Sequence, residues 1–258
     1  MSVVTEFSAG KLKVNIYENR GLMGAAMADD VAKIINELLK EKSEVRMIFA
    51  AAPSQKDFYD ALVQKDLDLS KVVAFHMDEY VGLEAGSENL FGNYLKKHLF
   101  DKVNFKKVNL IETYSGDVNV VCEKYSELLS EAPIDIVAMG IGENGHIAFN
   151  DPYVADFKDP KLVKIIEIDK ESKQQQVNDG CFTSYDEVPK RAVTLSVPAL
   201  LSSTYRFVAV PGKPKANAVS KTIYSEISNS CPSTILRSAE NTTLYLDSDS
   251  AHSLNLEN

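Results

Sequence analysis

The sequence has no tryptophan, only three cysteines and only four histidines among its 258 residues. The cysteines Cys122, Cys181 and Cys231 are odd in number and widely spaced, which favours neither a disulfide framework nor a cysteine-based metal site. There is no apolar run of about 18 residues that could span a membrane. The N-terminal MSVVTEFSAGK also lacks the charged-then-apolar order of a signal peptide. These absences predict a protein of the reducing cytoplasm, with no membrane as its partner.

Positive charge is in deficit as well. The chain carries 28 basic and 37 acidic side chains, for a formal net charge of -9. An acidic surface argues against nucleic acid or an anionic membrane as the main partner, so a site for an anionic substrate must gather its basic groups locally. Apolar residues make up 45% of the chain, and no repeat, low-complexity tract or linker interrupts it. A single domain over residues 1–258 is the simplest prediction.

Helix-like and strand-like apolar patterns alternate along the chain. The patterns predict helices over residues 21–42, 54–62, 87–100, 118–130 and 215–226. They predict strands over residues 45–51, 71–77, 108–111, 134–139, 163–168, 192–197, 207–210 and 243–246. This alternation predicts an α/β fold of three layers, with a mostly parallel, Rossmann-like sheet covered by helices on both faces. In such folds ligands bind beyond the carboxyl ends of the strands, where the strand order reverses.

Small residues follow the first predicted strand and lead into a helix. The segment Ala52-Pro53-Ser54-Gln55 would present free backbone N–H groups and the positive end of a helix dipole, which favour an anion such as phosphate. The Ser54 hydroxyl could add a donor. The alternative is that Ser54, three residues before Asp57, only caps its helix.

Two adjacent carboxylates follow the second predicted strand, in the segment His76-Met77-Asp78-Glu79-Tyr80. Desolvating both of them is costly unless they are exposed or paired. A partly buried carboxylate has a raised pKa and can act as a general base. The alternative is a strand-end loop whose acids are solvated.

The segment GIGENGHIAFNDP, residues 140–152, is the richest in polar chemistry. Its glycines, among them Gly145, let the backbone turn sharply and approach a ligand closely. Histidine titrates near neutral pH, so His146 could transfer protons, and Asn144 and Asp151 lie near enough along the chain to orient its imidazole. A lone histidine is more often structural, but a glycine-rich loop after a buried strand favours a functional one.

The same segment matches the dinucleotide pattern G-x-G-x-x-G through Gly140, Gly142 and Gly145. A true fingerprint needs a helix that begins at the third glycine and directs its N-terminus at the pyrophosphate. Pro152 and Pro160 leave little room for such a helix. We therefore exclude a nicotinamide site.

Two of these segments, FHMDEYVGL (75–83) and GIGENGHIAFNDP (140–152), resemble the signature segments of the glucosamine-6-phosphate deaminase/isomerase family. The resemblance extends over nearly the whole chain and includes QQQVNDGCF (174–182), GKPKANAV (212–219) and PSTILR (232–237). The 6-phosphogluconolactonases share this fold and some of the loops. The acidic MDEY sequence is more like the deaminases.

The resemblance implies roles for individual residues. Asp78 corresponds to the base that removes the C2 proton of the opened sugar, and His146 to the histidine that assists opening of the pyranose ring. In the best-known deaminases an aspartate two residues before this histidine and a glutamate five residues after it complete a triad. Asn144 and Asp151 stand at those places in this chain. Asn144 can hydrogen-bond the imidazole but cannot balance its positive charge.

The resemblance also implies a phosphate site. Family members commonly have a glycine-glycine-threonine-proline loop where this chain has residues 52–55, so Ser54 takes the place of the threonine, while Pro53 removes a backbone donor. Lys215 matches a basic phosphate ligand within its motif. Lys173 stands where an arginine is common and would supply a point charge in place of a bidentate fork; the alternative is a solvated helix face.

The function that the resemblance implies is conversion of glucosamine 6-phosphate to fructose 6-phosphate and ammonium. No metal or redox cofactor is needed, since the carbonyl next to C2 makes the C2 proton acidic. Alternatives on the same fold are a galactosamine-6-phosphate deaminase/isomerase and a 6-phosphogluconolactonase. A non-catalytic sugar-phosphate sensor is an alternative from a different class. Family members occur in several assemblies, so a homo-oligomer is left open.

Overall fold

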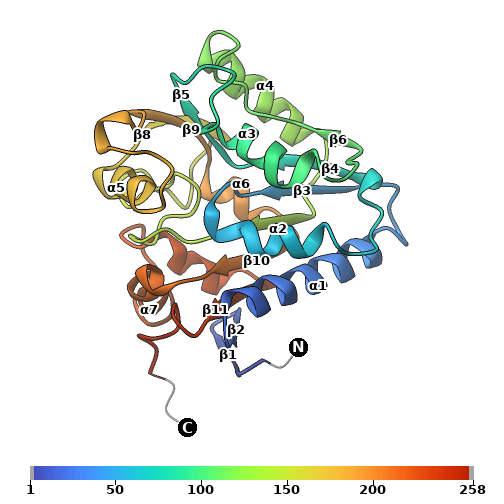
Figure 1. Ribbon diagram of the computed structural model, residues 1–258, viewed down its shortest axis with the longest axis vertical. Coiled ribbons are helices and arrows are strands. Elements are labelled where there is room, and N and C mark those ends of the chain that lie inside the picture. The colour runs from blue at the N-terminus through green and yellow to red at the C-terminus, as the bar shows by residue number, and fades with distance from the viewer. Residues whose placement is uncertain (1–2, 256–258) are drawn as a thin grey trace.

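Helices and strands alternate through residues 3–255, which the computed structural model describes (Figure 1). The strands are β1 (Thr5–Ala9), β2 (Leu12–Tyr17), β3 (Val45–Phe49), β4 (Val72–His76), β5 (Asp78–Val81), β6 (Lys107–Val108), β7 (Ile136–Met139), β8 (Val163–Glu167), β9 (Arg191–Leu195), β10 (Tyr205–Val210) and β11 (Thr242–Asp247). The helices are α1 (Arg20–Leu38), α2 (Lys56–Leu62), α3 (Phe91–Leu95), α4 (Val118–Ser130), α5 (Lys170–Asn178), α6 (Val197–Leu201) and α7 (Ala216–Tyr224). Within the described residues, no helix combines the length and the apolar composition that crossing a bilayer requires.

Most strands form one sheet, in the order β1-β2-β11-β10-β7-β3-β4-β6. Within this sheet β1 pairs antiparallel with β2 at one edge, and the other neighbours pair in parallel. The strand order reverses between β3 and β7, because the chain proceeds from β3 outward to β4 and β6, and later from β7 outward to β10 and β11. The prediction of a mostly parallel α/β sheet is confirmed.

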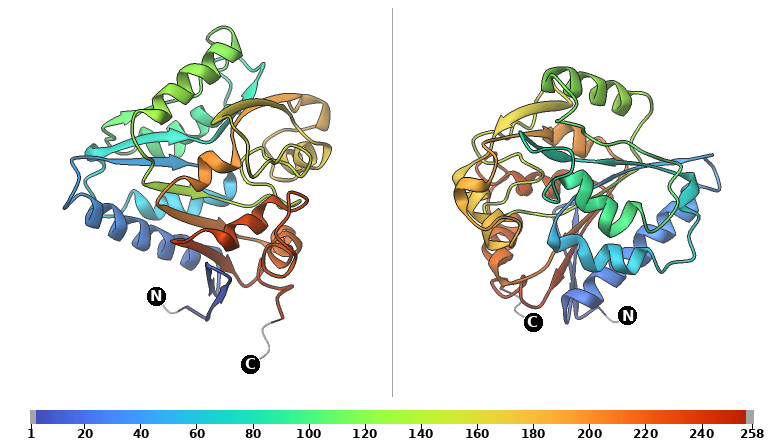
Figure 2. Two further views of the ribbon diagram at one scale, coloured as in Figure 1. Left: turned by 180° about the vertical axis from the view of Figure 1, so that it is seen from behind. Right: turned by 45° about the horizontal axis from the view of Figure 1, so that its top comes forward.

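Helices cover both faces of this sheet, because its strands are apolar on both sides. In β7, Ile136 and Ala138 belong to one hydrophobic core, and Val137 and Met139 belong to the other. The buried residues of α1, α2 and α3 complete the first core, and those of α4, α6 and α7 complete the second. Figure 1 looks onto the first layer of helices, and the left view of Figure 2 looks onto the second. The three-layer prediction is therefore confirmed.

A smaller antiparallel sheet, β5-β9-β8, lies beside the main one. The strands predicted over residues 163–168 and 192–197 are present as β8 and β9, but they pair with each other and with β5, and not within the parallel sheet. The backbone N–H of Leu195 donates to the carbonyl of Met77 at 2.8 Å. This bond joins β9 to the link between β4 and β5, so the small sheet is attached where Asp78 begins β5.

The start of α2 differs from the predicted capping box at Ser54 and Asp57. A 3-10 turn, Pro53–Gln55, precedes α2, and no side chain caps either helical start. The Ser54 hydroxyl instead accepts a hydrogen bond from the side chain of Gln55 at 3.3 Å. The Asp57 carboxylate accepts a hydrogen bond from the guanidinium of Arg20. The capping-box prediction is wrong: the Ser54 hydroxyl contacts the side chain of the next residue, and Asp57 is bound by Arg20 from a distant part of the chain.

His76 ends β4 as a fully buried imidazole. Its Nε2 accepts a hydrogen bond from the backbone N–H of Ile111 at 2.8 Å. The Tyr125 hydroxyl bonds both the N–H and the carbonyl of the same residue at 2.9 Å. Burial lowers the pKa of His76 to about 4, so the neutral ring is the form that joins β4 to its neighbours.

Acid should destabilise the protein through His76. Because the pKa of His76 is lower in the folded chain, the unfolded chain binds an extra proton between about pH 6.5 and pH 4. The contribution of this group is complete above that range and is lost as the pH falls through it, by up to about 3 kcal/mol. Urea unfolding at about pH 7 and about pH 4.5 should show a smaller acid loss in the His76→Gln variant than in the wild type. Equal losses would contradict this prediction.

Candidate active site

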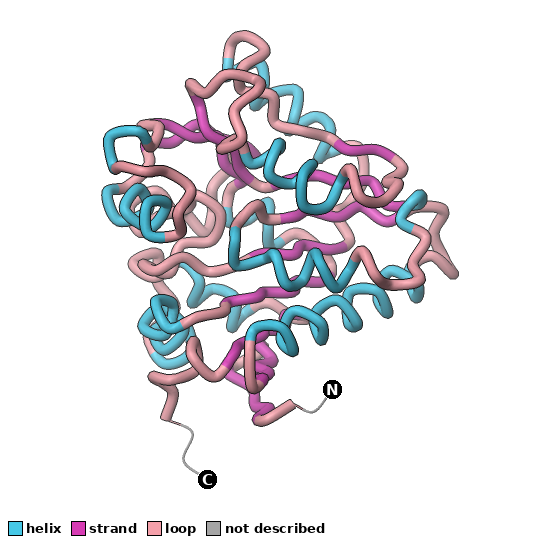
Figure 3. The backbone as a smooth tube through the Cα atoms, in the orientation of Figure 1, coloured by secondary structure: helices cyan, strands magenta, loops and turns pink. Residues whose placement is uncertain are grey.

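Strands β10, β7, β3 and β4 are neighbours, and their carboxyl ends meet at one edge of the main sheet. The loops that leave β3 and β10 lie on the side of the sheet where these strands end (Figure 3). The reversal of strand order between β7 and β3 lies at the same edge, which is where α/β sheets bind ligands. An open cavity lies here, and small-molecule sites are concave regions of this kind.

Residues predicted from separate parts of the sequence meet in this cavity. Its lining includes the predicted site residues Ala52, Pro53, Ser54, Gln55, Asp78, His146 and Lys215. Other lining residues come from the glycine-rich segment, from α3 and from the region of α5, among them Gly142, Ala148, Phe149, Phe91, Gln175, Gln176 and Asp179. A carboxyl group, an imidazole and an ammonium thus share one open space.

Two residues predicted as substrate contacts lie outside this lining. Lys173 is buried, and its ammonium stands over the ring of Tyr185, 4.4 Å from the centroid. Gly145 has a φ of 87°, and a Cβ at this position would stand 2.6 Å from the Sγ of Cys231. Lys173 therefore makes a cation–π contact, and Gly145 shapes a tight turn. Neither position supports contact with a ligand in the cavity.

His146 closes a short turn at the cavity. The backbone N–H of Gly142 donates to the carbonyl of His146 at 2.9 Å, and the N–H of Gly145 donates to the carbonyl of Gly142 at 3.0 Å. The imidazole stands directly over Gly142, where a Cβ would lie 2.1 Å from Cε1 and 2.2 Å from Nε2. Only glycine at position 142 leaves room for the ring.

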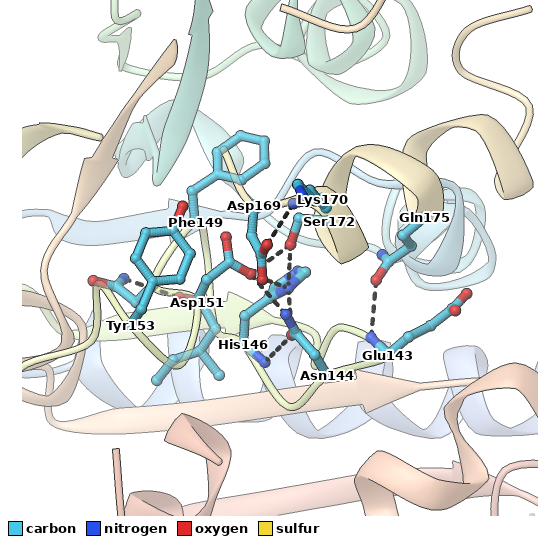
Figure 4. A network of polar contacts seen from close by, with 12 residues as sticks. Glu143, Asn144, His146, Phe149, Asp151, Tyr153, Asp169, Lys170, Ser172 and Gln175 are labelled. Carbon is cyan, nitrogen blue, oxygen red and sulfur yellow. Dashed lines mark hydrogen bonds and ion pairs between the residues drawn. The ribbon is translucent and has the colours of Figure 1, made fainter. Parts of the chain in front are cut away.

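Three side chains surround the Nδ1 atom of His146 (Figure 4). The Asn144 Oδ1 and the Ser172 Oγ each lie 2.9 Å from Nδ1, and the Asp151 Oδ1 lies 3.2 Å from it. The Asp151 Oδ1 also accepts hydrogen bonds from the side-chain N–H of Asn144 at 2.9 Å and from the hydroxyl of Ser172. Asp151 therefore reaches the imidazole although its side chain is one methylene shorter than glutamate.

The contacts of its Oδ1 atom keep Asp151 ionised. Burial acts to raise the pKa of Asp151, but contacts with His146, Asn144 and Ser172 outweigh it and hold the pKa at about 2. The carboxylate is therefore ionised throughout the neutral range. Acceptors around Nδ1 favour a proton on that nitrogen of His146, which leaves Nε2 as the acceptor.

Asp78 and Glu79 are adjacent carboxyl groups with different surroundings. Burial, and less strongly the neighbouring carboxyl of Glu79, raise the pKa of Asp78 well above its ordinary value. Glu79 accepts hydrogen bonds of 2.8 to 2.9 Å from the backbone N–H groups of Tyr80, Phe91 and Gly92. Burial raises the pKa of Glu79 to about 7, although these bonds act to lower it. Glu79 thus joins β5 to the start of α3, whereas Asp78 lines the cavity.

Lys215 ends the 3-10 turn before α7 and exposes only 6% of its surface. Burial lowers the pKa of Lys215, and the charges of Asp179 and Glu143 partly offset this effect. These two carboxylates act on the ammonium through their charges and not through a hydrogen bond. A buried cation without a hydrogen bond is costly, so an anionic ligand in the cavity would relieve that cost.

Gln55 holds the segment between β3 and α2 against β10. Its side-chain N–H group donates to the carbonyl of Ala209 at 3.1 Å and to the Ser54 Oγ at 3.3 Å. A Cβ on Gly140 would lie 3.0 Å from the same nitrogen, so this glycine allows the close approach. Because Ser54 is the acceptor of this bond, its own hydroxyl proton remains available to a ligand.

Helix α5 supplies site residues that the sequence analysis missed. Gln175, Gln176 and Asp179 line the cavity, and Ser172 contacts His146. The buried residues of α5 are all polar, so no apolar periodicity indicates the helix. The sequence feature that could have pointed to these residues was the segment QQQVNDGCF, which resembles a family motif. It contains no histidine or basic residue that would mark it as part of a site.

The glycine-rich segment does not lead into a helix. From residue 140 to residue 169, all of which are described, the chain forms turns, loops and β8. The crossover helix that a dinucleotide fingerprint needs is therefore missing from this stretch, as Pro152 and Pro160 predict. The glycines serve the turn around His146 instead.

Known proteins resemble this chain over most of its length. Residues 18–245 match the family described as glucosamine-6-phosphate isomerases/6-phosphogluconolactonase. A glucosamine-6-phosphate deaminase from Bacillus cereus (strain B4264) is 30% identical over 223 residues, which are 86% of this chain and 83% of that protein. A glucosamine-6-phosphate deaminase from Lactobacillus helveticus (strain DPC 4571) is 29% identical over 243 residues, which are 94% of this chain and 98% of that protein.

Solved structures share the fold. The structure of a monomeric glucosamine-6-phosphate deaminase is similar with a TM-score of 0.86 and 26% identity, over 93% of this chain and 99% of that chain. The 6-phosphogluconolactonase from Thermotoga maritima is similar with a TM-score of 0.74 and 19% identity, over 92% of this chain and 99% of that chain. At the latter identity the likeness concerns the fold alone.

Replacing Gly142 by alanine should disturb the imidazole. The added Cβ would overlap the ring of His146, so the ring must leave its contacts with Asn144 and Ser172, at a cost of about 1–3 kcal/mol. Urea unfolding measures this cost, and Gly86→Ala is the matched control because no atom lies within 4 Å of its added Cβ. Wild-type stability of Gly142→Ala, with the imidazole unmoved in its crystal structure, would refute the prediction.

Proposed function

The chain belongs to the family of glucosamine-6-phosphate isomerases and 6-phosphogluconolactonases, and we propose that it converts glucosamine 6-phosphate to fructose 6-phosphate and ammonium. The observation that carries the proposal is a single cavity lined by the buried carboxyl of Asp78, the imidazole of His146 and the buried ammonium of Lys215. Acid–base groups beside an anion site suit proton transfer on a phosphorylated sugar. Relatives that are 30% and 29% identical carry the name of this reaction.

The phosphate of the substrate binds beside Lys215 and the Ser54 hydroxyl. Asp179 and Glu143 act on Lys215 through their charges but without a hydrogen bond, and Ser54 retains a hydroxyl proton to donate. A hydrogen bond between a charged donor and a phosphate contributes roughly 1.5–3 kcal/mol. This anchor fixes one end of the sugar, so that its reacting carbons lie in the same cavity as the carboxyl and the imidazole.

His146 assists opening of the pyranose ring. With the proton on Nδ1, its Nε2 atom can accept the proton of the C1 hydroxyl and pass it to the ring oxygen, as the bond between C1 and the ring oxygen breaks and the C1 carbonyl forms. The ionised Asp151 lies 3.2 Å from Nδ1 and stabilises the positive charge that the imidazole then carries. Asn144, which is neutral, holds the ring in place.

Asp78 is the base for the isomerisation. It removes the C2 proton of the open-chain sugar, a double bond forms between C1 and C2, and the C1 oxygen takes up a proton from solvent, which gives an enolamine. Asp78 then gives its proton to C1, which leaves an imine at C2; water hydrolyses this imine to the ketone and releases ammonium. Burial supports this role, since it raises the pKa of Asp78 and so the strength of the base.

Two other reactions on this fold remain as alternatives. Galactosamine 6-phosphate differs from the proposed substrate only in the configuration at C4, and it would undergo the same steps. Hydrolysis of 6-phosphogluconolactone needs no base at C2, so the buried carboxyl of Asp78 favours deamination. A sugar-phosphate sensor would bind these compounds without turnover.

A substrate panel tests the proposal. Ammonia release is measured with glucosamine 6-phosphate and galactosamine 6-phosphate, and acid release with 6-phosphogluconolactone. We expect ammonia from glucosamine 6-phosphate, and we expect Asp78→Asn to lower its kcat by about 10²–10⁴-fold, because an amide cannot take up the C2 proton. Binding of the sugar phosphate, measured by calorimetry, should remain.

Glu84→Gln is the matched control, because it removes an exposed carboxylate outside the cavity. Its turnover should equal that of the wild type. Near-normal turnover by Asp78→Asn would remove Asp78 from the base role. Binding without turnover by the wild type would favour a sensor, and acid release from the lactone alone would favour a lactonase.

Substitution of Lys215 should weaken substrate binding. Lys215→Met keeps the length of the side chain but removes the charge, and we expect KM to rise about 10- to 100-fold, as for the loss of one charged hydrogen bond. Lys213→Met is the matched control, since Lys213 lies in the same 3-10 turn and is exposed. Steady-state kinetics with glucosamine 6-phosphate measures both. The same KM in the two variants would count against a phosphate site at Lys215.

A further inference from the structure

We propose that Ser172 is a positioning residue, which connects the imidazole of His146 to the carboxylate of Asp151 and ties helix α5 to both. This inference deepens the proposed function and rests on it. Ser172 lies 21 positions from Asp151 and 26 from His146 along the chain. The residue exposes only 1% of its surface. A residue with this setting acts through its contacts and not by touching the substrate.

The contacts of the Ser172 hydroxyl define its role. Its Oγ lies 2.9 Å from the Nδ1 atom of His146 and donates a hydrogen bond to the Oδ1 atom of Asp151. A hydroxyl has one proton to donate and two lone pairs to accept with. Because Asp151 is ionised, the hydroxyl proton goes to the carboxylate, and a lone pair of Oγ accepts the Nδ1 proton of the imidazole.

The direction of these hydrogen bonds determines which nitrogen of the His146 imidazole carries the proton. A proton held on Nδ1 leaves Nε2 unprotonated, which is the form that can accept a proton from the sugar. Asn144 also accepts from Nδ1, but its Oδ1 is shared with the backbone N–H of His146. Asn144 also links the ring to the Asp151 carboxylate, through its side-chain N–H group, so Ser172 adds a second bridge, which comes from α5.

Ser172 also compensates for the short acidic side chain. Asp151 stands where the best-known deaminases have a glutamate, and its Oδ1 lies 3.2 Å from Nδ1, at the long end of hydrogen-bond distances. The 2.9 Å contact through the Ser172 hydroxyl is shorter and joins the same two groups. His146 and Asp151 are thus joined both directly and through the Ser172 hydroxyl.

The same residue fixes one wall of the cavity. Ser172 lies in the first turn of α5, and one turn later Gln175 accepts a hydrogen bond from the backbone N–H of Glu143 at 2.8 Å. The fully buried side chains of α5 are polar, and of its apolar residues Val177 packs against the core, so hydrogen bonds contribute much of what holds this helix. Gln176 and Asp179 reach the cavity from this helix and the turn that follows it. The position of this wall is therefore coupled to the imidazole.

Ser172→Ala tests the inference in the full-length protein. We expect kcat for glucosamine 6-phosphate to fall about 10- to 100-fold, as for partners that orient a reacting group, while KM changes less than about threefold. Ser172→Cys, with a weak donor, should lie between the alanine variant and the wild type. Gln174→Ala is the matched control, because this exposed residue of α5 bonds only Asn178 among the described residues and should leave kcat unchanged.

A double-mutant cycle separates the relay from simple packing. If Ser172 acts through the carboxylate, Ser172→Ala should cost much less in an Asp151→Asn background than in the wild type. Equal costs in both backgrounds would show that Ser172 and Asp151 act independently and would overturn the inference.

A readout that needs no turnover keeps the inference distinct from the proposed function. The ¹⁵N resonances of the His146 imidazole, assigned with His146→Gln, report which ring nitrogen carries the proton. We expect the Nδ1–H form in the wild type and a smaller share of it in Ser172→Ala. If Ser172→Ala shows this change of tautomer but the wild type releases no ammonia, the positioning role of Ser172 is supported and the proposed deaminase function is rejected. Loss of turnover with no change of tautomer would assign Ser172 to folding and overturn the inference.

Discussion

The parallel pairing of β10, β7, β3 and β4 is the constraint on which the site depends. Because parallel strands end at the same edge, segments that are far apart along the chain deliver Ser54, Asp78, His146 and Lys215 into one cavity. Apolar residues on both faces of these strands bury the sheet between two layers of helices. The strand ends are therefore the part of the sheet that remains open to a ligand.

The polar groups at this edge fall into two kinds. Asp151 and Glu79 are provided with several hydrogen-bond donors by the protein itself, which lets them be buried and hold neighbouring elements in place. Asp78 and Lys215 are buried as well, yet the shifts in their pKa values arise from burial and from charges without a hydrogen bond. In the proposed reaction, Asp78 and Lys215 are the groups that contact the substrate.

The sequence predicted those parts of the fold whose pattern is local. The runs that became β3, β4, β7 and β10 are mainly apolar, with single polar residues such as Arg46 and Arg206, so strands and their ends could be located. β5 was missed because it begins with Asp78 and Glu79, and α5 was missed because its buried side chains are polar. The strands that became β8 and β9 were found, but their pairing was not, because apolar pattern does not specify a partner strand.

By itself, the sequence determined which chemical groups are present and which follow a buried strand: the carboxyl of Asp78, the imidazole of His146 and the ammonium of Lys215. Only the tertiary structure decided which groups meet. It directed Lys173 to Tyr185 and brought Ser172 to the imidazole. The physical reason is that periodicity reports burial along one segment, whereas a contact between distant segments depends on how helices and sheets pack against one another.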